Sequence, residues 1–160
     1  MKKLTLERTF PATIDRVWDS FVSPLLLQSW WAPPGMHCRY PTVDLRPGGM
    51  FHYCFQGDDE HCFWGRAVYQ SIEEPNYLSL LDAFADEHGN AVAPSYYGIP
   101  GDEVLENLVE FEFTTEGPNT HMLVMMDNPY DEAMTEELIQ GWHGMFDKLV
   151  ALLQSAPVVS

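Results

Sequence analysis

The sequence predicts an α+β fold in which a curved antiparallel sheet of six to seven strands is covered by one long C-terminal helix. Three observations predict this class. Residues 3–10 alternate between apolar and polar side chains, as a half-buried strand does. Short segments rich in aromatic and β-branched residues, separated by turn residues, fill 36–126. Residues 129–153 then carry apolar side chains at helical spacing, and a helix of that kind buries its apolar stripe against a sheet.

Two short helices are predicted between the first strand and the rest of the sheet. The first lies within residues 11–21, where apolar side chains recur at helical spacing and Thr13 is the expected N-cap. The second begins at Ser23, whose hydroxyl is a capping group, with Pro24 at the first helical position. Two prolines and a glycine at 33–35 end this helix.

Six further strands are predicted, separated by one long loop. They comprise residues 36–45, 48–57, 60–73 and 76–84, and a hairpin over 107–126 with its turn at 116–119. The intervening segment, 85–106, is rich in glycine, proline and acidic residues around Tyr96 and Tyr97. Loops of this length are usually functional or mobile. We expect it to serve as a lid or as a homodimer contact.

The C-terminal helix is the strongest secondary-structure prediction. Asn128 is the expected N-cap and Pro129 the first helical residue. One apolar stripe then continues over about five turns. It consists of Met134, Leu138, Trp142, Met145, Leu149 and Leu152. Gly141 and Gly144 weaken a helix by about 1 kcal/mol each relative to alanine, so we expect both to allow close approach of another element.

The composition excludes several classes of partner. Eight Lys and Arg against 24 Asp and Glu give a net charge of −16. Such a surface repels nucleic-acid phosphates and anionic membranes. No apolar run reaches the length that spans a bilayer, and the first ten residues lack the apolar core of a signal peptide. Free thiols at Cys38, Cys54 and Cys62 in a reducing, cytoplasmic protein are the expectation.

Histidine and cysteine lie close together at several places, which raises the question of a metal site. If the hairpin pairs Phe55 with Glu60, then His52, Cys54 and His61 share one face as a triangle of zinc-type ligands. Their spacing matches no zinc motif, and a slip of one residue in register separates them. The opposite, core-facing side then carries Phe51, Tyr53, Phe55, Cys62 and Trp64. The sequence therefore predicts no metal site.

No catalytic or cofactor motif is present. The chain contains no Gly-x-Ser-x-Gly elbow, no P-loop and no Gly-x-Gly-x-x-Gly. Glu110 and Glu112 alternate with Phe111 and Phe113, so inward phenylalanines leave both glutamates solvated. His121, alone on its strand, is expected to be a surface or hydrogen-bonded residue. We therefore predict no catalytic residue and no cofactor.

Four stretches resemble one known family. These are "LTLERTFPATIDRVWDSFVSPLLLQSWWAPPG", "DLRPGGMF", Gly65 with the following "RAVYQSIEEPNYL", and "LIQGWHGMFDKLVALL". They are similar to the START-like (SRPBCC) helix-grip superfamily, in the branch named for the C-terminal domain of the ATPase activator of the ninety-kilodalton heat-shock chaperone. The resemblance implies a single START-like domain over residues 1–160, with its core at about 4–153. The loop at about 85–106 departs from the family pattern.

The resemblance also implies where the adjacent indoles of Trp30 and Trp31 lie. They would sit at one end of the groove between sheet and helix, with one indole facing the core or cavity and the other covering an edge. The chaperone activator uses a separate N-terminal domain for which this chain has no room, which argues against stimulation of the chaperone.

We therefore expect a small-molecule binding module that holds an apolar or aromatic ligand between the sheet and the C-terminal helix. The expected pocket residues are Trp31, Phe51, Tyr53, Trp64, Phe111, Met122, Trp142 and Phe146. One alternative is a small enzyme of the cyclase or dehydratase kind, as some superfamily members are, with one acid or base projecting into the cavity. The other is a protein-interaction module that assists a chaperone.

Overall fold

The elements follow the predicted order. The computed structural model of the protein describes residues 2–155. The helices are α1 (Ile14–Val22), α2 (Pro24–Trp30), α3 (Glu132–Gln154) and the short 3₁₀ helix η1 (Pro94–Tyr97). The strands are β1 (Lys2–Phe10), β2 (His37–Val43), β3 (Met50–Gln56), β4 (Cys62–Glu73), β5 (Tyr77–Phe84), β6 (Asn107–Glu116) and β7 (Asn119–Asn128). None of the helices within 2–155 is long and apolar enough to cross a membrane.

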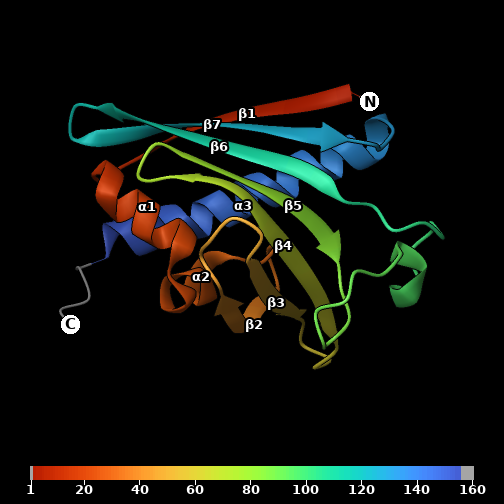
Figure 1. The fold of residues 1–160 in the computed structure, drawn as a ribbon. Coiled ribbons are helices and arrows are strands. Elements are labelled where there is room, and N and C mark those ends of the chain that lie inside the picture. The colour runs from red at the N-terminus through yellow and green to blue at the C-terminus, as the bar shows by residue number, and fades with distance from the viewer. Residues whose placement is uncertain (1, 156–160) are drawn as a thin grey trace.

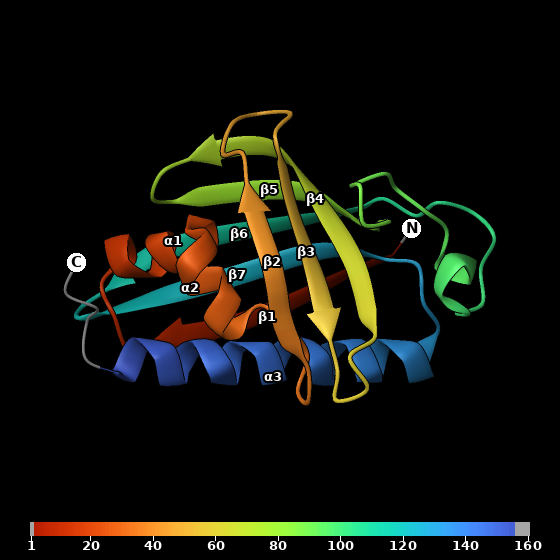
Figure 2. The same ribbon diagram turned by 90° about the horizontal axis from the view of Figure 1, so that it is seen from below.

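All seven strands form one antiparallel sheet in the order β1-β7-β6-β5-β4-β3-β2. The sheet bends around α3, so that in Figure 1 β1, β7 and β6 lie above the helix and β3 and β2 lie below it. Figure 2 shows α3 running the length of the molecule, with α1 and α2 at the end where α3 terminates. The predicted helix-grip arrangement of sheet, two short helices and long C-terminal helix is confirmed.

The core lies between the concave sheet face and α3. Side chains along β7 alternate strictly between buried and partly exposed, as expected for a strand with one buried face. From α3, Trp142, Phe146 and Leu149 are buried against this face. The predicted apolar stripe is therefore buried from Trp142 to Leu149, while at its end Leu153 is buried and Leu152 only partly so. Its first residue, Met134, keeps 43% of its surface exposed, which leaves the first turns of α3 less covered than the last.

The start of α3 differs from the prediction. Asn128 is the last residue of β7 rather than a cap, and the N-cap is Asp131, whose Oδ1 accepts a hydrogen bond from the Met134 amide at 2.9 Å. Asn128 instead closes a turn before the helix. Its Oδ1 accepts from the Tyr130 amide at 3.2 Å, and its Nδ2 donates to Thr135 Oγ1 at 2.9 Å. Asparagine and aspartate both serve turns and caps, so the sequence alone does not separate the two roles.

The two adjacent tryptophans point to different surroundings. The Trp30 indole is buried, packs on Phe21 with ring centroids 4.8 Å apart, and donates from Nε1 to the Ser20 carbonyl at 2.8 Å. Trp31 meets Trp30 edge-on at 5.3 Å and turns toward the sheet and α3, where it meets Trp142 at 5.7 Å. One indole therefore completes the helical layer and the other reaches the space between sheet and α3.

The loop after the tryptophans is attached directly to α3. Lys148 Nζ donates to three backbone carbonyls of this loop, those of Ala32, Pro33 and Met36, at 2.9–3.0 Å. Gly144 allows this contact, because a Cβ there would stand 2.2 Å from Pro34 Cγ. The close approach predicted for Gly144 is thus present. Gly141 differs, since a Cβ added to it would meet no other atom of residues 2–155 within 4 Å.

The register of the β3–β4 hairpin differs from the one considered for a metal site. Phe55 pairs with Phe63, not with Glu60, and Cys54 pairs with Trp64. The offset is three residues, an odd number, so every β4 side chain lies on the face opposite to the one expected. His61 precedes the strand. The His52, Cys54 and His61 triangle therefore does not form.

The segment between β5 and β6 is anchored rather than free. Ala85 and Ala91 form an isolated bridge, and η1 follows. The Tyr97 hydroxyl accepts from the Trp64 amide at 3.0 Å and donates to the Ala85 carbonyl at 2.5 Å. Its ring lies 5.4 Å from that of Phe63. Tyr97 therefore joins η1 to β4 and to the end of β5. A lid or a homodimer contact at this segment stays a prediction.

Replacing Tyr97 by phenylalanine is expected to lower the free energy of unfolding by about 1–2 kcal/mol, because two backbone groups lose their partner. Chemical denaturation followed by far-UV circular dichroism measures this. Tyr96→Phe is the matched control, since Tyr96 is 60% exposed and its hydroxyl makes no hydrogen bond within residues 2–155. Equal effects of the two substitutions would contradict the anchoring role of Tyr97.

Candidate functional site

A cavity of about 400 Å³ lies between the β3–β5 part of the sheet and the first half of α3. This volume is at the lower end of the range for small-molecule sites. The lining residues are Trp31, Pro33, Tyr53, Phe55, Phe63, Trp64, Gly65, Asp82, Ala83, Phe84, Leu105, Asn107, Tyr130, Met134, Glu137, Leu138, Gly141, Trp142 and Met145. The wall is mostly aromatic and aliphatic, with few polar groups.

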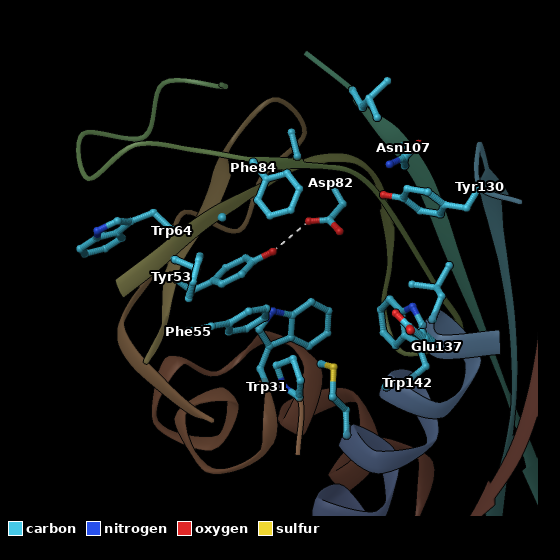
Figure 3. Close-up of a pocket in the computed structure, with 18 of the residues that line it drawn as sticks. Trp31, Tyr53, Phe55, Trp64, Asp82, Phe84, Asn107, Tyr130, Glu137 and Trp142 are labelled. Atoms are coloured by element: carbon cyan, nitrogen blue, oxygen red, sulfur yellow. Dashed lines mark hydrogen bonds between the residues drawn. The ribbon is translucent and has the colours of Figure 1, made fainter. Parts of the chain in front are cut away.

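Three of the residues expected in the pocket have their rings on this wall. Trp31 and Tyr53 meet at 6.0 Å, and Trp31 and Trp142 meet at 5.7 Å, both edge-on. Figure 3 shows the Tyr53 ring extending toward Asp82, with the Trp31 ring next to it and the Trp142 ring across the space. The structure thus brings together one residue from the segment after α2, one from β3 and one from α3.

Trp64 borders the cavity, but its indole points away from it. The ring stacks on His52, with centroids 4.7 Å apart, and lies 5.9 Å from Tyr40. Figure 3 shows the Trp64 side chain directed to the far side of its strand. The expectation of an inward indole is corrected here. The cause is the hairpin register, which places Phe63 and Gly65 on the inner face in its place.

The other four expected residues do not line the cavity. Phe51 is 2% exposed, and Phe111, Met122 and Phe146 are fully buried. They belong to the packed core between sheet and α3. Phe111 packs on Phe21 and Trp142, for example, with centroids 5.1 and 6.1 Å apart. Only part of the groove is open, because α1 and α2 supply side chains such as Phe21 that close the other part.

Asp82 and Tyr53 form the polar centre of the cavity. The Tyr53 hydroxyl donates to Asp82 Oδ1 at 2.9 Å. Asp82 follows Leu78 and Leu80 at alternate positions of β5, so it takes an inward position in an otherwise apolar row. In Figure 3 its carboxyl group points into the space between Tyr53 and Tyr130. This is an acidic group on an apolar wall.

Burial controls the protonation of this pair. It raises the pKa of Asp82 from 3.8 to about 6, although the hydrogen bonds from Tyr53 and the Ala83 backbone act in the opposite direction. Burial, and then the negative charge of Asp82, raise the pKa of Tyr53 and of Tyr130 above 10.0. Both phenols therefore stay neutral at physiological pH, while Asp82 titrates close to it.

Two further polar side chains of the wall come from β6 and α3. Asn107 pairs with Asp82 across β5 and β6, and Glu137 is exposed on α3. Gly141 leaves room beside them, because no side chain projects from α3 at that point. Within the described residues no Lys, Arg or His lines the cavity. The wall therefore combines aromatic rings with negative charge only.

Sequence reasoning missed Asp82, and a signal for it existed. The strand "YLSLLDAF" contains one charged residue among apolar and small ones. Alternation places this residue on the same face as Leu78 and Leu80. A charge at an inward position of a buried strand indicates a functional or paired group. Tyr130 and the residues of the first turns of α3 carried no comparable signal, because only the tertiary fold brings them together.

The acidic and basic side chains of β6 and β7 lie away from the cavity. Glu112 is exposed, and Glu110 accepts a hydrogen bond from the Tyr77 hydroxyl at 2.5 Å. Phe111 and Phe113 are buried, so the predicted orientation of this strand is present. His121 lies 3.6 Å from a Glu7 carboxylate oxygen, on the outer side of β7. None of these groups reaches Asp82.

Comparison with known proteins agrees with this geometry. The family described as activator of Hsp90 ATPase homolog 1-like protein matches residues 11–154. The chain belongs to this family. No curated protein matches the sequence.

Solved structures show the same fold. Protein Ms6760 from Mycobacterium smegmatis is 27% identical, with a TM-score of 0.76 over 97% of this chain and 92% of its own. A protein from Arthrobacter aurescens is 25% identical, with a TM-score of 0.79 over 99% and 90%. The AHSA1 protein from Silicibacter pomeroyi is 19% identical, with a TM-score of 0.73 over 95% and 97%, and shows the fold alone. Family and fold together support a ligand-binding helix-grip module as the general class.

Proposed function

We propose that this protein binds a small, largely apolar or aromatic molecule in the cavity between the sheet and the first half of α3. The observation that carries the proposal is the cavity itself. About 400 Å³ remains open beside a core that is otherwise filled with aromatic side chains. A concave space of this size lined by aromatic rings is the kind of surface on which small molecules bind.

The Tyr53–Asp82 pair in the wall indicates how a ligand would be oriented in the cavity. An apolar cavity with a few convergent polar groups is the usual form of a small-molecule site. Here the Tyr53–Asp82 hydrogen bond stands on the sheet side, opposite Trp31 and Trp142. A ligand would place its apolar body against the indoles and one polar group at Asp82. Burial of such a body supports micromolar affinity, about −8 kcal/mol.

Gly141 provides the test. We expect the uncharged fluorescent probe N-phenyl-1-naphthylamine to bind the wild-type protein with a micromolar dissociation constant. Gly141→Leu should weaken that binding at least tenfold, because its side chain extends into the open space beside α3. Gly141→Ala, which adds a single methyl group, should stay within about threefold of wild type. Fluorescence titration measures all three constants.

Two results would count against the proposed site. One is the absence of probe binding to the wild-type protein. The other is equal binding by wild type and Gly141→Leu, which would place the probe elsewhere. Circular dichroism of each variant verifies that the fold is retained.

A second candidate function is proton transfer on a bound substrate, and one observation favours it. A carboxyl group projects into the cavity, with a hydrogen-bond partner, Tyr53, that orients it. A pKa of about 6, raised by burial, suits a general base near neutral pH. Exchange of carbon-bound hydrogen for deuterium in a co-purified ligand, lost in Asp82→Asn, would establish this activity. Binding of the ligand without any such exchange would exclude proton transfer and leave binding as the proposed function.

A further inference from the structure

The carboxyl group in the cavity has no positive partner. Tyr53 is the only side chain that donates a hydrogen bond to Asp82 within residues 2–155, and no ion pair there includes Asp82. Glu137, at the rim, adds a second acidic group, and no basic side chain among residues 2–155 lines the wall. An ionised carboxylate without a counter-ion is costly in an apolar site. A positive charge placed beside it would therefore be stabilised.

The aromatic rings around Asp82 favour the same kind of charge. Trp31, Tyr53, Tyr130 and Trp142 surround the space into which Asp82 points. The face of an aromatic ring attracts cations, indole most strongly, and the attraction grows when water is excluded. The same faces also accept an apolar or aromatic body. The Asp82 carboxylate and the surrounding rings would therefore both attract a positively charged group of the ligand.

We propose that the cavity selects ligands that carry a protonated amine on a small apolar or aromatic body, with the ammonium group paired to Asp82. This inference rests on the proposed binding function and adds the ligand class to it. An anionic ligand would bring its charge beside Asp82 and Glu137 without a basic residue to offset the repulsion. A neutral ligand would leave the carboxylate unpaired.

Affinity for an amine is expected to depend on pH. Asp82 is faced by Tyr53 from β3, Asn107 from β6, Tyr130 from the turn before α3, and Glu137 from α3. Both tyrosines stay neutral, because burial raises their pKa. Burial also raises the pKa of Asp82 to about 6, so acidification to pH 5 protonates most of this carboxyl group. Amine affinity should then fall about tenfold from pH 7.5 to pH 5.

Three probes with one apolar body test the inference. They are 2-(1-naphthyl)ethylamine, which is a cation at pH 7.5, 2-(1-naphthyl)ethanol, which is neutral, and 1-naphthaleneacetate, the anion of 1-naphthaleneacetic acid. Isothermal titration calorimetry at pH 7.5 should show the amine binding at least tenfold more tightly than the alcohol, and the acetate at least tenfold more weakly than the alcohol. Asp82→Asn should remove this preference, so that the amine and the alcohol bind the variant with equal affinity.

The outcomes separate the two proposals. If the alcohol binds as well as the amine, or Asp82→Asn leaves amine binding unchanged, the amine inference is overturned and the binding site stands. If none of the three probes nor N-phenyl-1-naphthylamine binds, the proposed function fails as well. Asp19→Asn, an exposed aspartate on α1, is the charge-matched control and should leave the amine's affinity at the wild-type value.

Discussion

Replacing Asp82 by asparagine is expected to raise the free energy of unfolding at pH 7.5 by about 2–3 kcal/mol. The ionised carboxylate stands on an apolar wall, and burial raises its pKa from 3.8 to about 6. That difference corresponds to about 3 kcal/mol of penalty on the charged form, reduced somewhat because the side chain keeps some accessible surface. Asparagine retains an oxygen that accepts from Tyr53 and carries no charge.

The pH dependence gives the sharper measurement. Because the pKa of Asp82 is higher in the folded than in the unfolded state, the folded protein holds this proton more tightly. The resulting stability is present below about pH 4 and is lost as the pH rises through about 6. Urea denaturation at pH 4, 5, 6 and 7.5 should therefore show Asp82→Asn close to wild type at pH 4 and increasingly more stable above it.

The control for this experiment is Asp19→Asn, which removes the same charge from an exposed position on α1. The free energy of unfolding of Asp19→Asn should stay within about 0.5 kcal/mol of the wild-type value at each of the four pH values. A stability difference for Asp82→Asn that does not change with pH would contradict the burial of this carboxyl group. A loss of stability that grows as the pH rises would show that the carboxylate makes a net favourable interaction.

Two glycines three residues apart on α3 are expected to respond to alanine in opposite directions. At Gly144 the new Cβ would stand 2.2 Å from Pro34 Cγ and 2.8 Å from Pro34 Cδ, in a ring that cannot rotate away. We therefore expect Gly144→Ala to lower the free energy of unfolding by about 2 kcal/mol. At Gly141 the new Cβ meets nothing, so the higher helix propensity of alanine should add about 0.5–1 kcal/mol.

Chemical denaturation of the two variants should therefore differ by about 3 kcal/mol in the free energy of unfolding. Each variant serves as the control for the other, because both make the same substitution in the same helix. If Gly144→Ala were as stable as Gly141→Ala, the contact between α3 and the loop around Pro34 would be looser than the structure shows. A destabilised Gly141→Ala would mean that the space beside it is filled.

The sequence predicted the architecture well because the patterns behind it are local. Alternation in residues 3–10 and the apolar stripe of α3 each follow from one repeating spacing, and the order of these patterns determines the fold. The same reasoning failed for Trp64. The face of a strand depends on hairpin register, and the loop between β3 and β4 is longer than the tight turn that pairs Phe55 with Glu60.

The candidate site was only partly predictable. Trp31, Tyr53 and Trp142 are bulky residues at inward positions, and such residues are expected on any groove wall. Phe111 has the same character, yet it is covered by Phe21 of α1. Which part of a groove is filled depends on packing between distant segments, and spacing along the chain does not carry that information. Asp82, by contrast, was visible in the sequence as a lone charge at an inward position of its strand.

The attachment of Lys148 to three loop carbonyls determines how the site can admit a molecule. It holds the second half of α3, and the end of the helix is held in turn by Arg16, which donates to the Leu153 carbonyl at 2.6 Å. The turns that border the site come earlier, from Met134 to Gly141, and are less buried. Tilting these turns about the fixed half requires less free energy than global unfolding. If the cavity binds a small molecule as proposed, we expect these turns of α3, rather than the packed core, to move aside for it.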